Sequence, residues 1–268
     1  MKKFFMIFTF VVMAGVLAAC GTGGSEDGQT SGEQSADTDK KVLVMGTSAD
    51  YPPFEYVETA KSDEIIGFDV DLAKAITEKL GYEMEIKDID FNGLIPALQS
   101  NKVDFVLAGM TPTEERKENV DFSQVYYEAN HMIVSSKDSK IEKLEDLEGK
   151  KVGVQLGSIQ EGKAEEIKET IDITIDSRNR IPELVQEIKA GRFDAAIIED
   201  TVAKGYLEKN EDLQAFVLPN TEEAGSAVAF PKGSEHVEEF DKAITELKES
   251  GELDEMIKKW FGGEQPKQ

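Results

Sequence analysis

The sequence predicts an α/β protein with two domains, and three observations support this prediction. Short apolar segments with the composition of strands alternate with segments whose apolar residues recur every three or four positions, as in amphipathic helices. This alternation is typical of helices packed around a mainly parallel sheet. The pattern runs through the first half of the chain and starts again at Lys150. A length of 268 residues is enough for two domains, each with its own core.

The first half is predicted to form three strands and two helices: strands 41–47, 82–89 and 103–108, and helices 68–80 and 92–100. In the first helix an apolar residue recurs every four positions from Phe68 onward, and Gly81 ends the helix. Two prolines fix the loop 48–54 and hold its aromatic residues, Tyr51 and Phe54, in defined positions.

The second half repeats this arrangement, with predicted strands 150–156, 171–175 and 194–198, a helix rich in Glu and Lys after residue 160, and helices 181–190 and 201–209. Residues 126–135 are extended and are expected to pass between two lobes. Segments 213–219 and 226–230 are expected to be strands that lead back to the first lobe. An acidic helix from Ser234, interrupted near Gly251, is expected to pack on the first lobe through Leu253, Ile257, Trp260 and Phe261.

The charge of the chain excludes some classes of partner. The formal net charge is -24, and it becomes -26 once the first nineteen residues, which carry Lys2 and Lys3, are removed. Such a surface argues against nucleic acid and against adhesion to an anionic bilayer. One cysteine and two histidines give no sign of a metal site or an internal disulfide, so no cofactor is expected.

The first twenty residues have the features of a secretory signal. Two lysines precede an apolar run of sixteen residues, 4–19, which is short for a membrane span. The run ends in Leu17-Ala18-Ala19-Cys20, which resembles a bacterial lipobox. We therefore expect residues 1–19 to be a signal peptide, and lipid on Cys20 to anchor the protein to the outside of the cell membrane. Residues 20–40 lack bulky apolar side chains and are expected to form a flexible tether.

A candidate ligand site follows the strand 103–108. Gly109 lets the backbone turn, and Thr111 or Thr113 can cap a short helix that Pro112 is suited to start.

Arg116 is unusual in this helix, because the dipole disfavours a cation near a helix N-terminus. A guanidinium fixed beside a threonine hydroxyl and free amides can hold a carboxylate. The alternative is that Arg116 only pairs with Glu114, Glu115 or Asp121.

Polar and aromatic residues follow the strands of both halves, where α/β folds usually bind ligands. The first half offers Tyr51, Phe91, Gly109, Thr111 and Arg116, and the second offers Ser158, Ile159, Gln160, Glu199 and Asp200. Together they supply donors for a carboxylate, an anion for an amine and aromatic walls for a side chain. These are the requirements of an α-amino acid.

The chain closely resembles the polar amino-acid-binding family of solute-binding proteins, the receptors of ATP-driven importers. The resemblance runs from about Lys41 to Gly262 and rests on the motifs ADYPPFEY (49–56), IGFDVDLAKAI (66–76), DFNGLIPAL (90–98), AGMTPTEER (108–116), VGVQLGSIQE (152–161) and DAAIIEDTVA (194–203). It is most similar to arginine-binding lipoproteins of Gram-positive bacteria. The resemblance implies a type II periplasmic-binding-protein fold, with two α/β lobes joined by two crossing strands and a ligand cleft between them. Lobe 1 would comprise 41–128 and 225–263, lobe 2 would comprise 129–224, and 264–268 would be a tail.

The resemblance also implies the roles of the site residues. Arg116 matches the arginine that holds the ligand α-carboxylate. The other implied ligand-binding residues are Gly109, Met110 and Thr111 beside it, Ser158 and Ile159 as amide donors, Gln160 as a ligand contact or helix cap, and Tyr51 and Phe91 as an aromatic pair around the side chain.

Two positions depart from the family pattern. The aspartate expected to bind the α-amino group is Glu199 here, and the neighbouring Asp200 could share this role or cap the helix. Some binders of basic amino acids carry an aspartate where this chain has Ser48. Asp50 either supplies that charge or only forms a turn. His131 and His236 lie outside the motifs and are interpreted as structural or surface residues.

We therefore expect a monomeric, non-catalytic receptor that passes a basic amino acid to a membrane permease. Arginine is preferred over lysine and histidine, because the loops near the slot carry Asp50 and Asp90 and Arg116 is the one cation among the matched residues. The alternatives are a receptor for another polar amino acid, such as glutamine, and an enzyme similar to cyclohexadienyl dehydratases.

Overall fold

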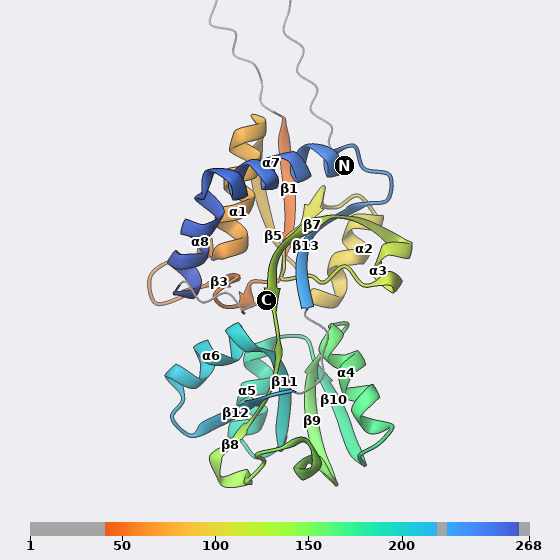
Figure 1. Cartoon of the computed structure of the whole chain (residues 1–268), viewed down its shortest axis with the longest axis vertical. Coiled ribbons are helices and arrows are strands. Elements are labelled where there is room, and N and C mark those ends of the chain that lie inside the picture. The colour runs from red at the N-terminus through yellow and green to blue at the C-terminus, as the bar shows by residue number, and fades with distance from the viewer. Residues whose placement is uncertain (1–40, 219–223, 263–268) are drawn as a thin grey trace, which may run out of the picture. The chain divides into compact units, whose positions relative to one another are not determined.

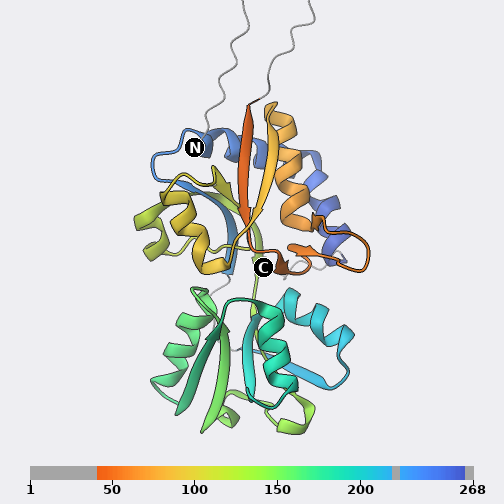
Figure 2. The same ribbon diagram turned by 180° about the vertical axis from the view of Figure 1, so that it is seen from behind.

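The computed structural model describes residues 41–218 and 224–262, and this part of the chain forms two five-stranded sheets with helices on both faces (Figures 1 and 2). The predicted signal peptide, Cys20, the tether and the predicted tail lie outside the described residues. Within the described residues, no helix is both long and apolar enough to cross a membrane.

The first sheet has the strand order β5-β1-β6-β13-β7. Its strands are β1 (Val42–Thr47), β5 (Glu83–Asp88), β6 (Phe105–Val106), β7 (Val120–Ala129) and β13 (Ala224–Pro231). β1 pairs in parallel with β5 and β6, whereas β13 pairs antiparallel with β6 and β7. β13 is thus the one strand of this sheet that runs against the others. A small sheet of β2 (Asp50–Tyr51), β3 (Glu55–Val57) and β4 (Ile65–Ile66) follows β1.

The helices of the first lobe cover both faces of its sheet. Side chains alternate between the two faces along a strand, so each face has apolar residues that a helix can cover. These helices are α1 (Phe68–Leu80), α2 (Leu94–Gln99) after the short 3₁₀ turn η1 (Phe91–Gly93), α3 (Glu114–Asn119), α7 (His236–Ser250) and α8 (Glu252–Phe261). Phe105 lies in the core with α1, α7 and α8, whereas the next residue, Val106, lies in the core with α2. Gly251, with φ of 82°, separates α7 from α8, as predicted.

The second sheet repeats the first in its order, β10-β9-β11-β8-β12. Its strands are β8 (His131–Ser136), β9 (Lys150–Gln155), β10 (Ile173–Arg178), β11 (Ala195–Glu199) and β12 (Leu213–Val217). β9 pairs in parallel with β10 and β11, and β8 is antiparallel to β11 and β12. In both sheets the reversed strand occupies the fourth position. The prediction of mainly parallel sheets is confirmed.

The helices of the second lobe are α4 (Ile159–Lys168), α5 (Ile181–Lys189) and α6 (Asp200–Lys209), with the 3₁₀ turns η2 (Lys137–Ser139) and η3 (Leu144–Leu147) after β8. Ile197 of β11 lies in the core with α4, and its neighbour Ile198 lies in the core with α5 and α6. The predicted strand 171–175 is wrong by a few residues, because pairing with β9 begins at Ile173 and extends to Arg178.

The chain passes between the sheets twice, and each time it enters a reversed strand: from β7 to β8 and from β12 to β13. β7 ends at Ala129 in the first sheet, and β8 begins two residues later in the second, as the extended segment 126–135 predicted. The predicted strands 213–219 and 226–230 correspond to β12, which pairs antiparallel with β8 in the second sheet, and to β13, which lies in the first sheet. The connection from β12 to β13 includes residues 219–223, which lie outside the described residues.

Candidate ligand-binding site

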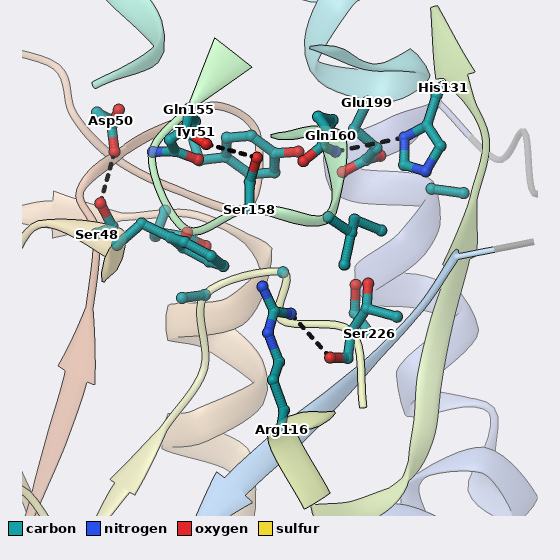
Figure 3. Close-up of a pocket in the computed structure, with 17 residues that line it drawn as sticks. Ser48, Asp50, Tyr51, Arg116, His131, Gln155, Ser158, Gln160, Glu199 and Ser226 are labelled. Atoms are coloured by element: carbon teal, nitrogen blue, oxygen red, sulfur yellow. Dashed lines mark hydrogen bonds between the residues drawn. The ribbon is translucent and has the colours of Figure 1, made fainter. Parts of the chain in front are cut away.

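Ten of the twelve predicted ligand-binding residues line one cavity. It lies where the loops that follow β1, β6, β9 and β11 meet, at the carboxyl ends of these strands (Figure 3). The ten are Asp50, Tyr51, Phe91, Gly109, Thr111, Arg116, Ser158, Ile159, Gln160 and Glu199. The structure therefore brings the two groups of predicted residues together, while their binding roles remain predictions.

Arg116 extends into the cavity from α3 (Figure 3). Thr113, not Thr111, is the N-cap: its Oγ1 accepts a hydrogen bond from the Arg116 amide at 3.2 Å, and Pro112 lies before the helix. The guanidinium donates to the carbonyl oxygens of Thr111, at 2.8 Å, and Gly157, at 2.9 Å. Burial lowers the pKa of Arg116 to about 10, so the group keeps its charge at neutral pH.

The alternative role of Arg116, as a partner of nearby acids, is wrong. The ion pairs of the described residues pair Glu114 with Lys117 and Asp121 with Lys232, and none includes Arg116. The hydrogen bonds of the guanidinium go to carbonyl oxygens, and the charge of Glu115 raises the pKa of Arg116 only against the larger effect of burial.

The two predicted aromatic walls have different surroundings. The centre of the Phe91 ring lies 5.4 Å from the guanidinium carbon of Arg116, which places a cation over the ring. Tyr51 is buried, and its ring contacts Phe54 at a centroid distance of 5.6 Å. Gly109 lies under Tyr51 with φ of 55°, and a side chain there would come within 3.2 Å of the Tyr51 ring. Its amide donates to Asp69 Oδ2 at 2.9 Å.

The second lobe contributes the N-terminus of α4. Ser158 is its N-cap, with Oγ accepting from the Glu161 amide, so Gln160 does not have the predicted capping role. The amide of Ile159 is in the first turn, where a helix supplies no backbone partner. The Gln160 side chain instead contacts His131, with 3.3 Å between Nε2 and Nδ1.

His131 corrects the sequence interpretation, because it lines the cavity and is almost completely buried. Burial lowers the pKa of its imidazole to about 4, so the ring is neutral at physiological pH. It occupies the first position of β8, and nothing in an apolar strand sequence marks its side chain as facing a cavity.

The structure distinguishes Glu199 from Asp200, the two residues that the sequence left as alternatives for binding the α-amino group. Glu199 ends β11 and lines the cavity, and its buried Oε1 has no hydrogen-bond partner among the described residues. Burial raises the pKa of Glu199 to about 8. Asp200 does not line the cavity. Its Oδ1 accepts from the Asn130 amide at 3.2 Å, and Lys204 lies 3.6 Å away, so Asp200 fixes the crossing between β7 and β8.

Asp50 lines the cavity, but its carboxylate already has partners. It accepts from Ser48 Oγ at 2.8 Å (Figure 3) and from the Ile181 amide, the first of α5, at 2.6 Å. Arg180 Nη1 lies 3.7 Å from Asp50 Oδ1. Burial raises the pKa of Asp50 to about 6 despite these contacts.

Met110 does not line this cavity. Its side chain is 1% exposed and packs with α2 in the core of the first lobe. The sequence did not predict seven other lining residues: Ser48, Glu55, Ala108, Ala129, His131, Gln155 and Ser226. Among the described residues no group of three or more His, Cys, Asp or Glu side chains could hold a metal ion.

Comparisons with known proteins agree with this arrangement. Residues 43–263 match the model of the bacterial extracellular solute-binding proteins, family 3. The arginine-binding extracellular protein ArtP of Bacillus subtilis (strain 168) is 57% identical over 266 residues, which cover 98% of this chain and all of ArtP. Among solved structures, the arginine-, lysine-, histidine-binding protein ArtJ of Geobacillus stearothermophilus has a TM-score of 0.79 and 35% identity, over 85% of this chain and 97% of ArtJ. An ancestral arginine-binding protein bound to glutamine has a TM-score of 0.78 and 41% identity, over 84% of this chain and 99% of that protein.

The fold and the cavity are those of a two-lobed solute-binding protein. The chain belongs to family 3 of the bacterial extracellular solute-binding proteins. This membership confirms the predicted fold class and the prediction of a receptor rather than an enzyme.

Proposed function

We propose that this protein binds a basic L-amino acid in the cavity, prefers arginine over lysine and histidine, and delivers it to the permease of an ATP-driven importer. The observation that carries the proposal is the charge arrangement around Arg116. One buried guanidinium without a carboxylate partner shares the cavity with three acidic side chains, Asp50, Glu55 and Glu199. A basic amino acid brings one carboxylate and two cations to this arrangement. The similarity to ArtP and ArtJ supports the same ligand class.

In this proposal Arg116 holds the α-carboxylate, with the amide of Ile159 and the Thr111 hydroxyl as further donors, because the Ser158 amide already donates to the Gln155 carbonyl at 3.2 Å. Glu199 receives the α-amino group, and the rings of Tyr51 and Phe91 border the side chain. Because each lobe provides part of the site, the lobes are expected to close on the ligand.

Glutamine is a second candidate, because a protein 41% identical to this chain has been solved with glutamine bound. Its neutral side chain would leave one cavity acid without a cation, which is unfavourable in a buried site. Calorimetric titration of the purified protein with the twenty amino acids separates the candidates. We expect arginine to bind most tightly. Tighter binding of glutamine or glutamate would overturn the preference for arginine, but the protein would still be an amino-acid receptor.

We also propose that lobe 1 comprises 41–128 and 225–263 and lobe 2 comprises 129–224, and that the mature protein is a monomer anchored to the outer face of the cell membrane through lipid on Cys20. Mass spectrometry of the membrane-extracted protein tests the anchor. A mature N-terminus at Cys20 with added acyl mass is expected, and an unmodified Cys20 would contradict it.

A further inference from the structure

Tyr127 connects the C-terminal helix of lobe 1 to the residues that follow β11 in lobe 2. It lies in β7, two positions before the strand ends at Ala129. The residue is 3% exposed and does not line the cavity. Its hydroxyl oxygen lies 3.3 Å from Oγ1 of Thr201, the second residue of α6. This hydrogen bond therefore joins the two lobes through a side chain that lies outside the cavity.

The ring of Tyr127 is held in place by lobe 1. It stacks on Phe261 of α8, with 4.5 Å between the ring centroids and 25° between the ring planes. Phe54 and Phe68 pack against the same ring, at centroid distances of 5.3 Å and 5.9 Å. A ring packed by three other rings has little freedom to change its orientation. Lobe 1 thus presents the Tyr127 hydroxyl to lobe 2 from a fixed position.

The direction of the hydrogen bond between Tyr127 and Thr201 follows from the number of hydrogens. Thr201 Oγ1 donates to Asp200 Oδ1 at 3.3 Å. Burial raises the pKa of Glu199, and hydrogen bonds from the hydroxyl and the amide of Thr201 lower it again in part. A threonine hydroxyl has one hydrogen to donate, and an ionised carboxylate can only accept it. Thr201 therefore gives its hydrogen to the acids, and Tyr127 is the donor to Thr201.

We propose that Tyr127 positions Glu199 for the α-amino group of the ligand, through the hydroxyl of Thr201. This inference rests on the proposed function, in which Glu199 receives that group. Tyr127 belongs to lobe 1 and Glu199 to lobe 2, so the chain of donors is complete only when the lobes lie together. Hydrogen bonds in such a chain strengthen one another. Closure of the lobes would then complete the α-amino site, with Tyr127 as a positioning residue that does not touch the ligand.

The Thr201 hydroxyl matters because Glu199 must be ionised to hold an ammonium group. The Tyr51 hydroxyl also lowers the pKa of Glu199, whereas the charge of Asp200 raises it. The titratable groups that interact with Glu199 from the elements around it are Asp200, Tyr51, Tyr126, Tyr127 and Glu55. Without the phenol, Thr201 has no partner that fixes the direction of its hydroxyl. Weaker donation to Glu199 then raises the pKa of this carboxyl further, and less of it is ionised at neutral pH.

Tyr127→Phe tests the inference, because it removes the hydroxyl and keeps the ring. Wild type and variant are titrated by calorimetry with arginine and with δ-guanidinovalerate, which is arginine without its α-amino group. One neutral hydrogen bond supports a loss of about threefold to tenfold for arginine in the variant. Affinity for δ-guanidinovalerate should change by less than about twofold, since this ligand has no group for Glu199.

Tyr82→Phe is the matched control. Its hydroxyl also donates to another side chain, Glu239 Oε1 at 3.2 Å, but both residues belong to lobe 1 and neither lines the cavity. This variant should bind arginine as wild type does.

The competing explanation is that Tyr127 only helps to hold the lobes together. Closure would then cost more for every ligand, and the variant would lose the same factor for arginine and for δ-guanidinovalerate. The ratio of the two losses therefore separates positioning of Glu199 from general support of the closed form.

The pH profile provides a second readout, which does not need measurable binding of δ-guanidinovalerate. In Tyr127→Phe, Glu199 keeps its proton to higher pH, so the loss of arginine affinity should be larger at pH 6.5 than at pH 8.5. Thr201→Val removes the hydroxyl between the two residues and should show the same change in the profile. The double variant should lose no more than Thr201→Val alone, because both changes interrupt one chain of donors.

Three results would contradict the inference: unchanged arginine affinity in Tyr127→Phe, equal losses for the two ligands, or losses that add in the double variant. Failure of the proposed function looks different, because wild type would then bind no basic amino acid, or would bind arginine no more tightly than δ-guanidinovalerate. Unfolding temperatures of the ligand-free proteins show whether a loss comes from misfolding. If Tyr127→Phe unfolds at a lower temperature than wild type, the comparison of the two ligands is made with Thr201→Val.

Discussion

Arg116 and Arg180 both reach from one lobe to the other, and their partners differ in kind. Arg116 of lobe 1 donates to the Gly157 carbonyl of lobe 2 and has no acid partner. Arg180 of lobe 2 donates to Asp90 at 2.6 Å and to Asp88 at 2.8 Å, both in lobe 1, and lies 3.7 Å from Asp50. The Asn179 amide adds a hydrogen bond to Asp90 at 3.0 Å.

The difference in partners indicates two different roles for an arginine side chain in this protein. The charge of Arg180 is matched by the protein itself, so its contacts hold the lobes together whether or not a ligand is present. In the proposed function the charge of Arg116 is matched by the ligand carboxylate, so its contribution would depend on what enters the cavity. The two arginines also differ in burial. Arg116 as a whole residue is 9% exposed, whereas the side chain of Arg180 is 25% exposed.

The largest effect is expected from Arg116→Ala. Truncation removes the buried donor of the ligand carboxylate and leaves that carboxylate unpaired, so arginine binding should weaken by about a hundredfold or more. Arg116→Lys should recover only part of this loss, because lysine lacks the planar fork. Calorimetry measures both variants.

Arg192→Ala is the matched control, since this arginine is exposed and pairs with Glu187 on the surface of lobe 2. It should bind arginine as wild type does. If Arg116→Ala also bound arginine with near-normal affinity, the distinction between the two arginines would be lost.

The pH dependence should come from the acids that face Arg116, because Arg116 keeps its charge throughout the range. Glu199, with a pKa of about 8 in the empty cavity, is mostly protonated at pH 6 and half ionised at pH 8. A cation binds the ionised form, so the proton must leave first and affinity should rise with pH. Between pH 6 and pH 8 the ionised fraction of Glu199 rises from about 1% to about 50%, so we expect arginine binding to strengthen up to about fiftyfold. Titrations at four pH values measure this rise, and a flat profile would show that no acid with a raised pKa meets the ligand.

Arg180→Ala should have the smallest effect on affinity and a visible effect on the ligand-free shape. Removing its contacts favours lobe separation, and closing the lobes on ligand then costs more. We expect arginine binding about fivefold weaker. Small-angle scattering should show a larger radius of gyration for the ligand-free variant than for wild type, and the two should converge at saturating arginine. Equal radii together with unchanged affinity would show that the aspartate contacts do not hold the lobes.

The sequence predicted the α/β layers because their signal is local. Alternation along strands and four-residue spacing along helices decide which face a residue takes, and Ile197 and Ile198 divide between two cores as this rule requires. Arg116 was predictable for a similar reason, since its conflict with the helix dipole can be read within one turn.

The remaining site residues depend on distant pairings that no local pattern contains. Glu55 faces the cavity because β3 pairs with β2 in a register that sets it opposite Tyr51. Arg180 finds aspartates about ninety positions earlier in the chain. Met110 was misplaced because a motif groups neighbours in sequence, whereas its side chain points into the core.

The strand order also bears on the sequence in which the lobes can be completed during synthesis. The strands of the second sheet come from one continuous stretch, 131–217, so all its partners exist once that stretch has left the ribosome. The first sheet must wait, because β13 fills the place between β6 and β7 and is made after the whole second lobe. Until then the edges of β6 and β7 have no partner in that place, and unpaired strand edges favour aggregation. A nascent chain that stalls before β13 therefore carries one finished sheet and one open one.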